Sequence, residues 1–361
     1  MAASTGAAAG GGSFIVNSYG GYSKKGYAPY NPRKKNQDSL VMAEDPKTRS
    51  LFLCVMDGHG EDGDKVSQNI KGKLTNYLFN HRDFATDVKA AIQDVLARCE
   101  TEILRESSIE TDFSGTTFTC AVIRDNKCIM ANVGDSRTSI AYRNSAGGAV
   151  GTNLTVDHKP DLPLEKVCLY EAGDLCAALS PSLSLSLFLS PSLPLSLSLS
   201  PSLSHDSRRF ALLHSFFPPQ ARIEAKGGRV FAVEYDDGVD GPARVWLGHM
   251  DVPGLAMSRS IGDAVAHSAG VSSEPEFFEY EFNKGREDLV LVMASDGLWE
   301  FMSDQEVMDI AVNTTEPRFA VDRLISESNE RWMKEEQVID DTTVCVAFLG
   351  NFQLQPPPSG K

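Results

Sequence analysis

Short apolar runs that stop abruptly at an acidic, glycine-bearing turn recur along this chain. Each run has the length of a strand and is bounded by turn residues, so each predicts a buried β-strand. The predicted strands are Ser50–Met56, Thr116–Ile123, Cys128–Val133, Asp288–Ser295 and Thr342–Leu349. The turn RDNK joins the second run to the third and predicts a hairpin. Strands joined by so short a turn must pair in the antiparallel direction.

Three other segments show the apolar spacing of an amphipathic helix. They are Val66–His81, Asp87–Glu106 and Ser303–Val312. In the last one, Ser303 followed by Glu306 forms a capping box, a pattern that marks helix starts. Helices and strands come in separate blocks, with a hairpin among the strands. We therefore expect an α+β fold built on antiparallel sheets rather than a doubly wound parallel sheet.

Aspartates stand beside several of these strands. They are Asp38, Asp57, Asp135, Asp296 and Asp340. Strand ends meet at the rim of a sheet or sandwich, so these carboxylates could share one cluster. Clustered carboxylates repel one another, and a hard cation relieves that repulsion. Oxygen ligands without companion histidine or cysteine clusters favour magnesium or manganese over zinc or copper.

His59 is the only histidine embedded in such an acidic turn. Two ions a few ångströms apart would lower the pKa of a bridging water and form hydroxide near neutral pH. Hydroxide is the nucleophile that in-line attack on phosphorus requires. A neighbouring histidine could then protonate the leaving oxygen.

The overall charge limits the classes of partner that the protein can bind. The chain has 34 Lys and Arg against 49 Asp and Glu, a formal net charge of −15. This balance argues against binding to nucleic acid or to an anionic membrane, because both need a positive surface. Seven scattered cysteines, never in CxxC pairs, predict free thiols in a reducing compartment. We expect a cytoplasmic monomer, with the nucleus as an alternative location.

Beyond these patterns, blocks of sequence between about Asn31 and Leu349 resemble, in order, the motifs of the metal-dependent Ser/Thr protein phosphatases of type 2C. The blocks are Asp57–Gly60 (DGHG), Ser114–Thr117 (SGTT), Asn132–Arg137 (NVGDSR), Asp157–Pro160 (DHKP), Pro253–Asp263 (PGLAMSRSIGD), Ala294–Glu300 (ASDGLWE) and Asp340–Thr343 (DDTT). The resemblance implies a central sandwich of two antiparallel β-sheets flanked by α-helices, a four-layer αββα arrangement. It also implies a site for two manganese or magnesium ions at one end of the sandwich.

The resemblance further implies residue roles by motif position. The metal ligands would be Asp57, the backbone carbonyl of Gly58, Asp296 and Asp340, with Asp38 acting through water and Asp135 joining Asp296 at a weaker third ion. The catalytic residues would be His59, as the general acid, and Asp57. Arg33 would bind the substrate phosphate, a role that Lys34 or Lys35 could share. Gln37 stands where the family often has an acidic residue, so we expect a modest loss of metal affinity.

The function that the resemblance implies is hydrolysis of phosphoserine and phosphothreonine in phosphoprotein substrates, by a water that bridges the two ions. Two alternatives stay open. One is a catalytically impaired relative that acts as a regulatory or binding module, impaired by Gln37 or by an insertion within the domain. The other is a hydrolase of a different phosphoester, such as a nuclease, although the acidic charge counts against a polyanionic substrate.

One segment interrupts the resemblance. From Leu179 to Ser204 only Leu, Ser, Pro and Phe occur, and these are the amino acids that all-pyrimidine codons encode. Valine codons begin with GT and glutamine has the codon CAG, so Val167 to Gln220 carries the marks of an intron. We hypothesise a translated, unspliced intron or a gene-prediction error rather than a regulatory loop.

Joining Lys166 to Ala221 restores a helix with Pro163 in its first turn and Gly227 at its end. The sequence YEAGD, Tyr170–Asp174, resembles the family's own EAGG and could draw an alignment into the insertion. The expected organisation is a flexible tail over residues 1–22, a phosphatase domain over residues 23–350 interrupted at residues 167–220, and a C-terminal tail over residues 351–361.

Overall fold

The computed structural model describes residues 5–7, 15–162, 218–235 and 238–350. Its strands are β1 (Thr5–Ala7), β2 (Val16–Lys24), β3 (Ser39–Asp45), β4 (Ser50–Met56), β5 (Gly58–His59), β6 (Gly115–Thr116), β7 (Phe118–Arg124), β8 (Lys127–Val133), β9 (Arg137–Arg143), β10 (Ala149–Asn153), β11 (Arg229–Tyr235), β12 (Gly238–Trp246), β13 (Pro253–Leu255), β14 (Ile261–Gly262), β15 (Glu276–Glu281), β16 (Glu287–Ala294) and β17 (Thr342–Leu349). Its helices are α1 (Gly63–Phe79), α2 (Val88–Leu104), α5 (Pro219–Ala225), α6 (Ala264–Ser268), α7 (Asp296–Trp299), α8 (Asp304–Val312) and α9 (Pro317–Glu335).

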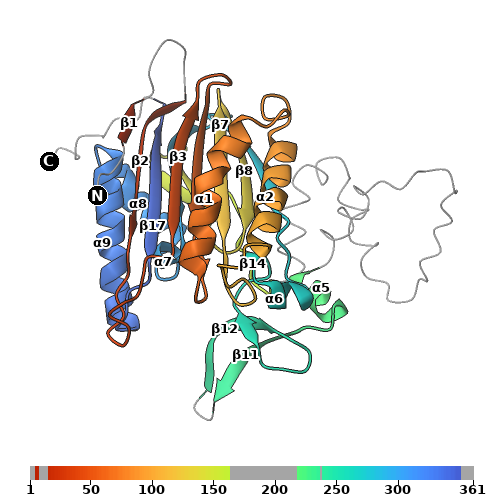
Figure 1. Cartoon of the computed structure of the whole chain (residues 1–361). Helices are drawn as coiled ribbons and strands as arrows, with labels where there is room; N and C mark the ends of the chain where they lie inside the picture. The colour runs from red at the N-terminus through yellow and green to blue at the C-terminus, as the bar shows by residue number, and fades with distance from the viewer. Residues whose placement is uncertain (1–4, 8–14, 163–217, 236–237, 351–361) are drawn as a thin grey trace, which may run out of the picture.

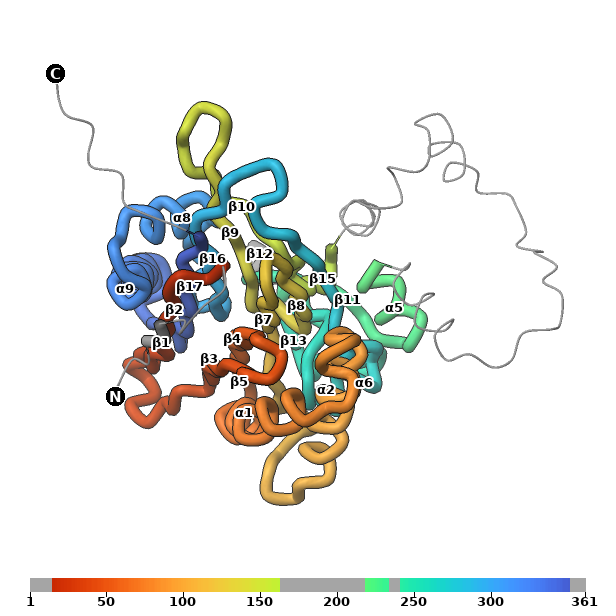
Figure 2. The backbone as a smooth tube through the Cα atoms, turned by 90° about the horizontal axis from the view of Figure 1, so that it is seen from above, coloured from red at the N-terminus to blue at the C-terminus, as the bar shows by residue number. Residues whose placement is uncertain are grey.

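Two large antiparallel sheets form the centre of the molecule. One has six strands in the order β1-β2-β17-β16-β9-β10, and the other has five in the order β15-β8-β7-β4-β3. Helices α1 and α2 cover the outer face of the five-stranded sheet, while α8 and α9 cover the six-stranded sheet (Figures 1 and 2). The prediction of an α+β fold with two antiparallel sheets between helical layers is confirmed.

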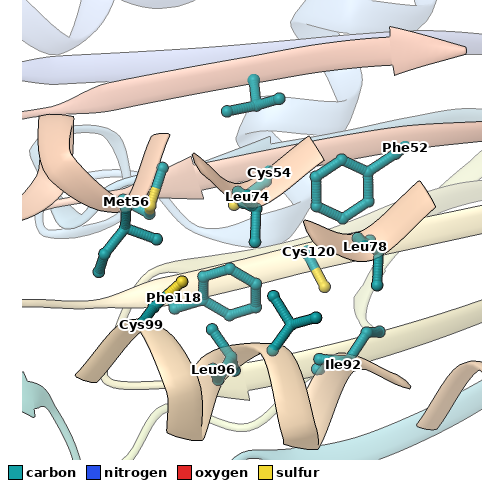
Figure 3. Close-up of a cluster of buried hydrophobic side chains, with 14 of the residues drawn as sticks. Phe52, Cys54, Met56, Leu74, Leu78, Ile92, Leu96, Cys99, Phe118 and Cys120 are labelled. Carbon is teal, nitrogen blue, oxygen red and sulfur yellow. The ribbon is translucent and has the colours of Figure 1, made fainter. Parts of the chain in front are cut away.

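Strand β4 has a continuous apolar sequence because all of its residues are buried. Alternate side chains point to opposite faces of a strand, and both faces of β4 are covered. Leu51, Leu53 and Val55 lie in the core between the two sheets. Phe52 and the side chains that alternate with it lie in the core beneath α1 and α2, against Leu74 of α1 (Figure 3). Burying one such large side chain contributes about 1.5–3 kcal/mol.

The predicted helices form at the expected places. The buried side chains of α1 include Ile70, Leu74 and Leu78, one turn apart on the face that meets the sheet. Helix α8 starts at the predicted capping box, where the Ser303 hydroxyl accepts from the backbone of Glu306 and the Glu306 carboxylate accepts from the backbone of Ser303. The predicted hairpin is β7 and β8, and the sheet positions of β4, β16 and β17 also match the predicted runs.

The six-stranded sheet begins earlier in the chain than we expected. Strand β2 pairs with β17 and lies partly within residues 1–22, for which we predicted a flexible tail. Val16 and Tyr19 of β2 are buried in the core between the sheets, so this segment has apolar surface to cover. Residues 1–4, 8–14 and the predicted C-terminal tail, 351–361, lie outside the described residues.

Most of the predicted insertion, residues 167–217, also lies outside the described residues. The description resumes at Pro218, and α5 follows with Pro219 in its first turn. Gly227 ends this segment with φ of +83°, the left-handed conformation typical of helix ends, as predicted. The start of this helix differs from the expectation. We assigned residues 218–220 to the insertion, but Pro218 is the N-cap of α5, and Pro219 and Gln220 are its first residues.

Two smaller sheets complete the fold. Strands β11, β12 and β13 form a three-stranded sheet that projects from the layered body beside α5 (Figure 1). Strands β14, β6 and β5 form a second small sheet, in which Gly115 of β6 pairs with His59 of β5 on one side and with Gly262 of β14 on the other. This sheet lies at the end of β4 and brings three distant segments together.

Candidate active site

Carboxylates from both large sheets meet at one end of the sandwich. Asp38 precedes β3 and Asp57 follows β4, and these strands pair so that Ser39 faces Met56. Asp296 follows β16, and its neighbour Ser295 donates from its hydroxyl to Oδ2 of Asp38, 2.9 Å away. Each sheet therefore contributes part of a single carboxylate cluster, as the strand ends predicted.

Burial and mutual repulsion shape the electrostatics of this cluster. Burial, followed by the charges of Asp38 and Asp296, raises the pKa of Asp57 well above its usual range. Burial is also the main cause that raises the pKa of Asp38 to about 7 and that of Asp296 to about 8. Buried carboxylates of this kind need a compensating cation or a proton.

The donor atoms of the cluster fit a hard divalent cation. Oδ1 of Asp38 and Oδ1 of Asp296 are buried and have no hydrogen-bond partner within the part of the chain that the structure describes. Among those same residues, no three or more His, Cys, Asp or Glu side chains are arranged to hold one ion together. One or two carboxylates per ion suits magnesium or manganese, which keep several waters when they bind.

The SGTT block fixes the backbone around Asp57. The backbone nitrogen of Asp57 donates to Oγ1 of Thr117 at 2.9 Å, and its carbonyl accepts from the backbone nitrogen of Thr117 at 2.8 Å. The hydroxyl of Thr116 donates to the same carbonyl at 3.0 Å. At Gly58 an added Cβ would lie 2.3 Å from the carbonyl oxygen of Gly63, so only glycine fits. Thr116 and Thr117 of the SGTT block therefore hold the backbone of Asp57 in place.

His59 is paired with an aspartate that we did not single out. Its Nε2 lies 2.6 Å from Oδ2 of Asp263, and both side chains are largely buried. Burial lowers the pKa of His59, but the charge and hydrogen bond of Asp263 outweigh burial, so the net shift is upward. The same pairing keeps the pKa of Asp263 low in spite of burial.

The three basic residues before Asp38, at positions 33–35, have different surroundings. Lys34 lies 3.2 Å from Oδ1 of Asp340 and 3.0 Å from Oδ2 of Asp341, and Lys35 lies 2.9 Å from Asp64. Arg33 is exposed and makes no hydrogen bond or ion pair with the residues that the structure describes. Of the three, Lys34 is the one that reaches the carboxylate cluster.

Asp135 is also engaged by a cationic side chain. It is buried and forms an ion pair with Nζ of Lys159, from the DHKP block. Two arginines of the motif blocks also form ion pairs. Arg137 lies 2.6 Å from Asp157, and Arg259 lies 2.6 Å from Glu276.

The two aspartates before β17 have different surroundings. The side chain of Asp340 is 45% exposed, whereas that of Asp341 is 4% exposed. Asp341 accepts from the backbone nitrogens of Gly26 at 2.7 Å and of Gln37 at 2.9 Å. Gln37 itself donates from Nε2 to the carbonyl of Gly60 at 2.7 Å. Sequence reasoning missed the separate roles of this pair, although both residues stood within the DDTT block.

Comparisons with known proteins agree with this architecture. The family model described as protein phosphatase 2C matches residues 31–176 and 220–335. The match extends into the predicted insertion, past the YEAGD segment to residue 176, and resumes at residue 220, the last residue of the insertion. Probable protein phosphatase 2C 35 of Arabidopsis thaliana is 28% identical over 333 residues, which cover 92% of this chain and 83% of that protein. Probable protein phosphatase 2C 12 of Oryza sativa subsp. japonica is 25% identical over 366 residues, covering 88% and 79%.

Solved structures share the fold. Serine-threonine phosphatase 2C from Toxoplasma gondii superposes with a TM-score of 0.67 at 18% identity, over 94% of this chain and 96% of that chain. A C. elegans sex determining protein superposes with a TM-score of 0.58 at 18% identity, over 95% and 66%. No helix among the described residues is both long and apolar enough to cross a membrane. From the family model, which matches most of the sequence, we conclude that this chain belongs to the protein phosphatase 2C family.

Proposed function

We propose that the protein hydrolyses phosphoserine and phosphothreonine in protein substrates with the help of two manganese or magnesium ions. The observation that carries this proposal is the cluster of buried carboxylates from both sheets, with unpartnered oxygens on Asp38 and Asp296. When bound, the ions would lower the pKa of a bridging water and stabilise negative charge on the phosphoryl oxygens.

The residues of this chain would divide the remaining work. Asp57, the carbonyl of Gly58, Asp296 and Asp340 would hold the ions, and Asp38 would orient their water. His59 would give a proton to the leaving oxygen of serine or threonine. A third ion at Asp135 would have to displace the ammonium of Lys159, which already neutralises that carboxylate.

Arg33 would bind the substrate phosphate. Its guanidinium is exposed, and a guanidinium matches the oxygens of a phosphate with two parallel hydrogen bonds. Lys34 and Lys35 already pair with carboxylates of the protein, so Arg33 is the cation of this segment that is free to meet an incoming anion.

The test is release of inorganic phosphate from a phosphothreonine peptide by the full chain, with and without manganese. We expect activity that depends on manganese and is lost in Asp57→Asn and in Asp296→Asn. Isothermal titration with manganese should show weaker binding by the same two variants. Activity that both variants retain would refute the assignment of the site, and an inactive chain that still binds manganese would favour the impaired regulatory module.

A further inference from the structure

The pairing of His59 with Asp263 leaves one nitrogen of the ring for chemistry. Nε2 of His59 lies 2.6 Å from Oδ2 of Asp263, and the Asp263 side chain is only 3% exposed. An ionised carboxylate can only accept a hydrogen bond, so Nε2 carries the hydrogen of this contact. Nδ1 is buried and has no hydrogen-bond partner among the described residues.

The small sheet β14-β6-β5 builds this contact. His59 of β5 and Gly262 of β14 pair with Gly115 of β6 from opposite sides. Asp263 is the residue after Gly262, so its side chain lies across the middle strand from His59. A Cβ at Gly115 would lie 2.1 Å from Oδ2 of Asp263. Glycine at position 115 is therefore required for the carboxylate to reach the imidazole across the middle strand.

The backbone at Asp263 is also held in an unusual conformation. Asp263 has φ of +45°, in the left-handed region that residues with a side chain rarely adopt, and its backbone nitrogen donates to the carbonyl of Ser114 at 3.0 Å. It stands at the N-cap of α6, where aspartate usually accepts from the helix backbone. Its side chain makes no such bond, and Oδ2 is directed to His59 instead.

From this geometry we infer that Asp263 is the positioning residue of His59: it holds Nε2, which leaves Nδ1 as the ring nitrogen that donates to the leaving group. The inference rests on the proposed function, in which His59 is the general acid. In that step the attacking water forms the new bond to phosphorus, and the ester bond breaks with its electron pair going to the serine or threonine oxygen. That oxygen takes the proton from Nδ1, which leaves a neutral imidazole, while Asp263 stays ionised.

Leaving-group dependence separates positioning of an acid from general support of the fold. An alkyl oxygen such as that of threonine is a poor leaving group and needs the proton, whereas the nitrophenolate of p-nitrophenyl phosphate leaves without it. For Asp263→Asn we expect kcat on a phosphothreonine peptide to fall by about 10- to 100-fold, part of the roughly 10²- to 10⁴-fold that a general acid contributes, because His59 itself remains in place. On p-nitrophenyl phosphate, kcat should fall by less than about three-fold, since the acid contributes little there.

Two further variants keep the inference falsifiable. Gly115→Ala places a methyl group between the partners and should reproduce the selective loss while both partners remain. Asp288→Asn is the matched control. Asp288 is a buried aspartate at the opposite end of β16 from Asp296, and it accepts from Tyr280 at 2.8 Å and from the backbone of Asn283 at 2.7 Å. It should reduce thermal stability without changing the ratio of the two activities.

Equal losses on both substrates in Asp263→Asn, or no loss on either, would overturn the inference. If Gly115→Ala does not fold, the measurement on Asp263→Asn decides alone. A wild-type chain without manganese-dependent activity on the peptide would instead refute the proposed function, so the two failures are distinguishable.

Discussion

Replacing Asp341 by asparagine should destabilise the fold, whereas the same change at the adjacent Asp340 should not. The buried carboxylate of Asp341 accepts from Gly26 and Gln37 and lies 3.0 Å from the ammonium of Lys34. An asparagine offers one oxygen, so its amide nitrogen must face one of these donors. An orphaned buried donor costs about 1–3 kcal/mol, and loss of the charge weakens the contact with Lys34.

We therefore expect Asp341→Asn to lower the free energy of unfolding by about 2–4 kcal/mol. Asp340 is half exposed, and an asparagine there can still accept from the backbone nitrogen of Asp341, which lies 2.7 Å from its Oδ1. Asp340→Asn should cost less than about 1 kcal/mol, the usual limit for an exposed ion pair. Urea denaturation measures both values, in the presence of a chelator so that metal binding does not contribute.

Manganese titration completes the comparison. Asp340→Asn should weaken metal binding while its fold stays intact, and Asp341→Asn should lose stability first. Equal stability of the two variants, or a loss below about 1 kcal/mol at Asp341, would refute the reasoning that buried backbone donors depend on this carboxylate.

Phe118→Ala should lower the free energy of unfolding, measured in urea, by about 3–5 kcal/mol, because Phe118 of β7 is buried in the core between the five-stranded sheet and helices α1 and α2. Ser303→Ala should cost about 1 kcal/mol by loss of the helix cap. Hydrogen bonds from the Ser303 backbone and hydroxyl lower the pKa of Glu306 from 4.5 to about 2. The stability that ionised Glu306 contributes is therefore present above pH 4.5 and is lost as the pH falls toward 2. The difference in free energy of unfolding between wild type and Glu306→Gln should disappear over that interval. Arg33→Ala should raise KM for a phosphopeptide without changing the melting temperature, and an unchanged KM would remove Arg33 from the site. Sequencing of cDNA across residues 167–220 should show transcripts that lack the segment, and transcripts that all contain it in frame would sink the intron hypothesis.

Much of the fold could be predicted because its strands are covered on both faces. Continuous apolar runs such as Ser50–Met56 and Thr342–Leu349 match β4 and β17 residue for residue. Helix α9 was missed although its buried residues include Ala320, Leu324 and Ser328, at helical spacing. Most of its other positions are polar, which dilutes the apolar signal. Strand β15 was missed because most of its residues are only partly buried.

The position of a carboxylate in the candidate site could be predicted where an aspartate lies next to the end of a strand. Asp57 directly follows β4 and Asp296 comes two residues after the end of β16, so each strand determines where the carboxylate lies. Asp263 was not recognised as a partner of His59, since the two residues meet only through the pairing of β14 and β5 with β6. The roles of Asp340 and Asp341 could not be separated from the sequence. The burial of Asp341 depends on contacts with the backbones of Gly26 and Gln37, which are close in space but distant in sequence.

The division of the carboxylate cluster between the two sheets has a thermodynamic consequence. A cation held by Asp57 and Asp296 would bridge the sheets and bind only while they are packed together. Its binding free energy is then linked to folding, and a free concentration of 100 times Kd would add about 2.7 kcal/mol to stability. Loosening the core between the sheets, for example at Leu53 or Leu291, would weaken metal affinity without touching a ligand. Metal affinity would then report how tightly the two sheets pack together.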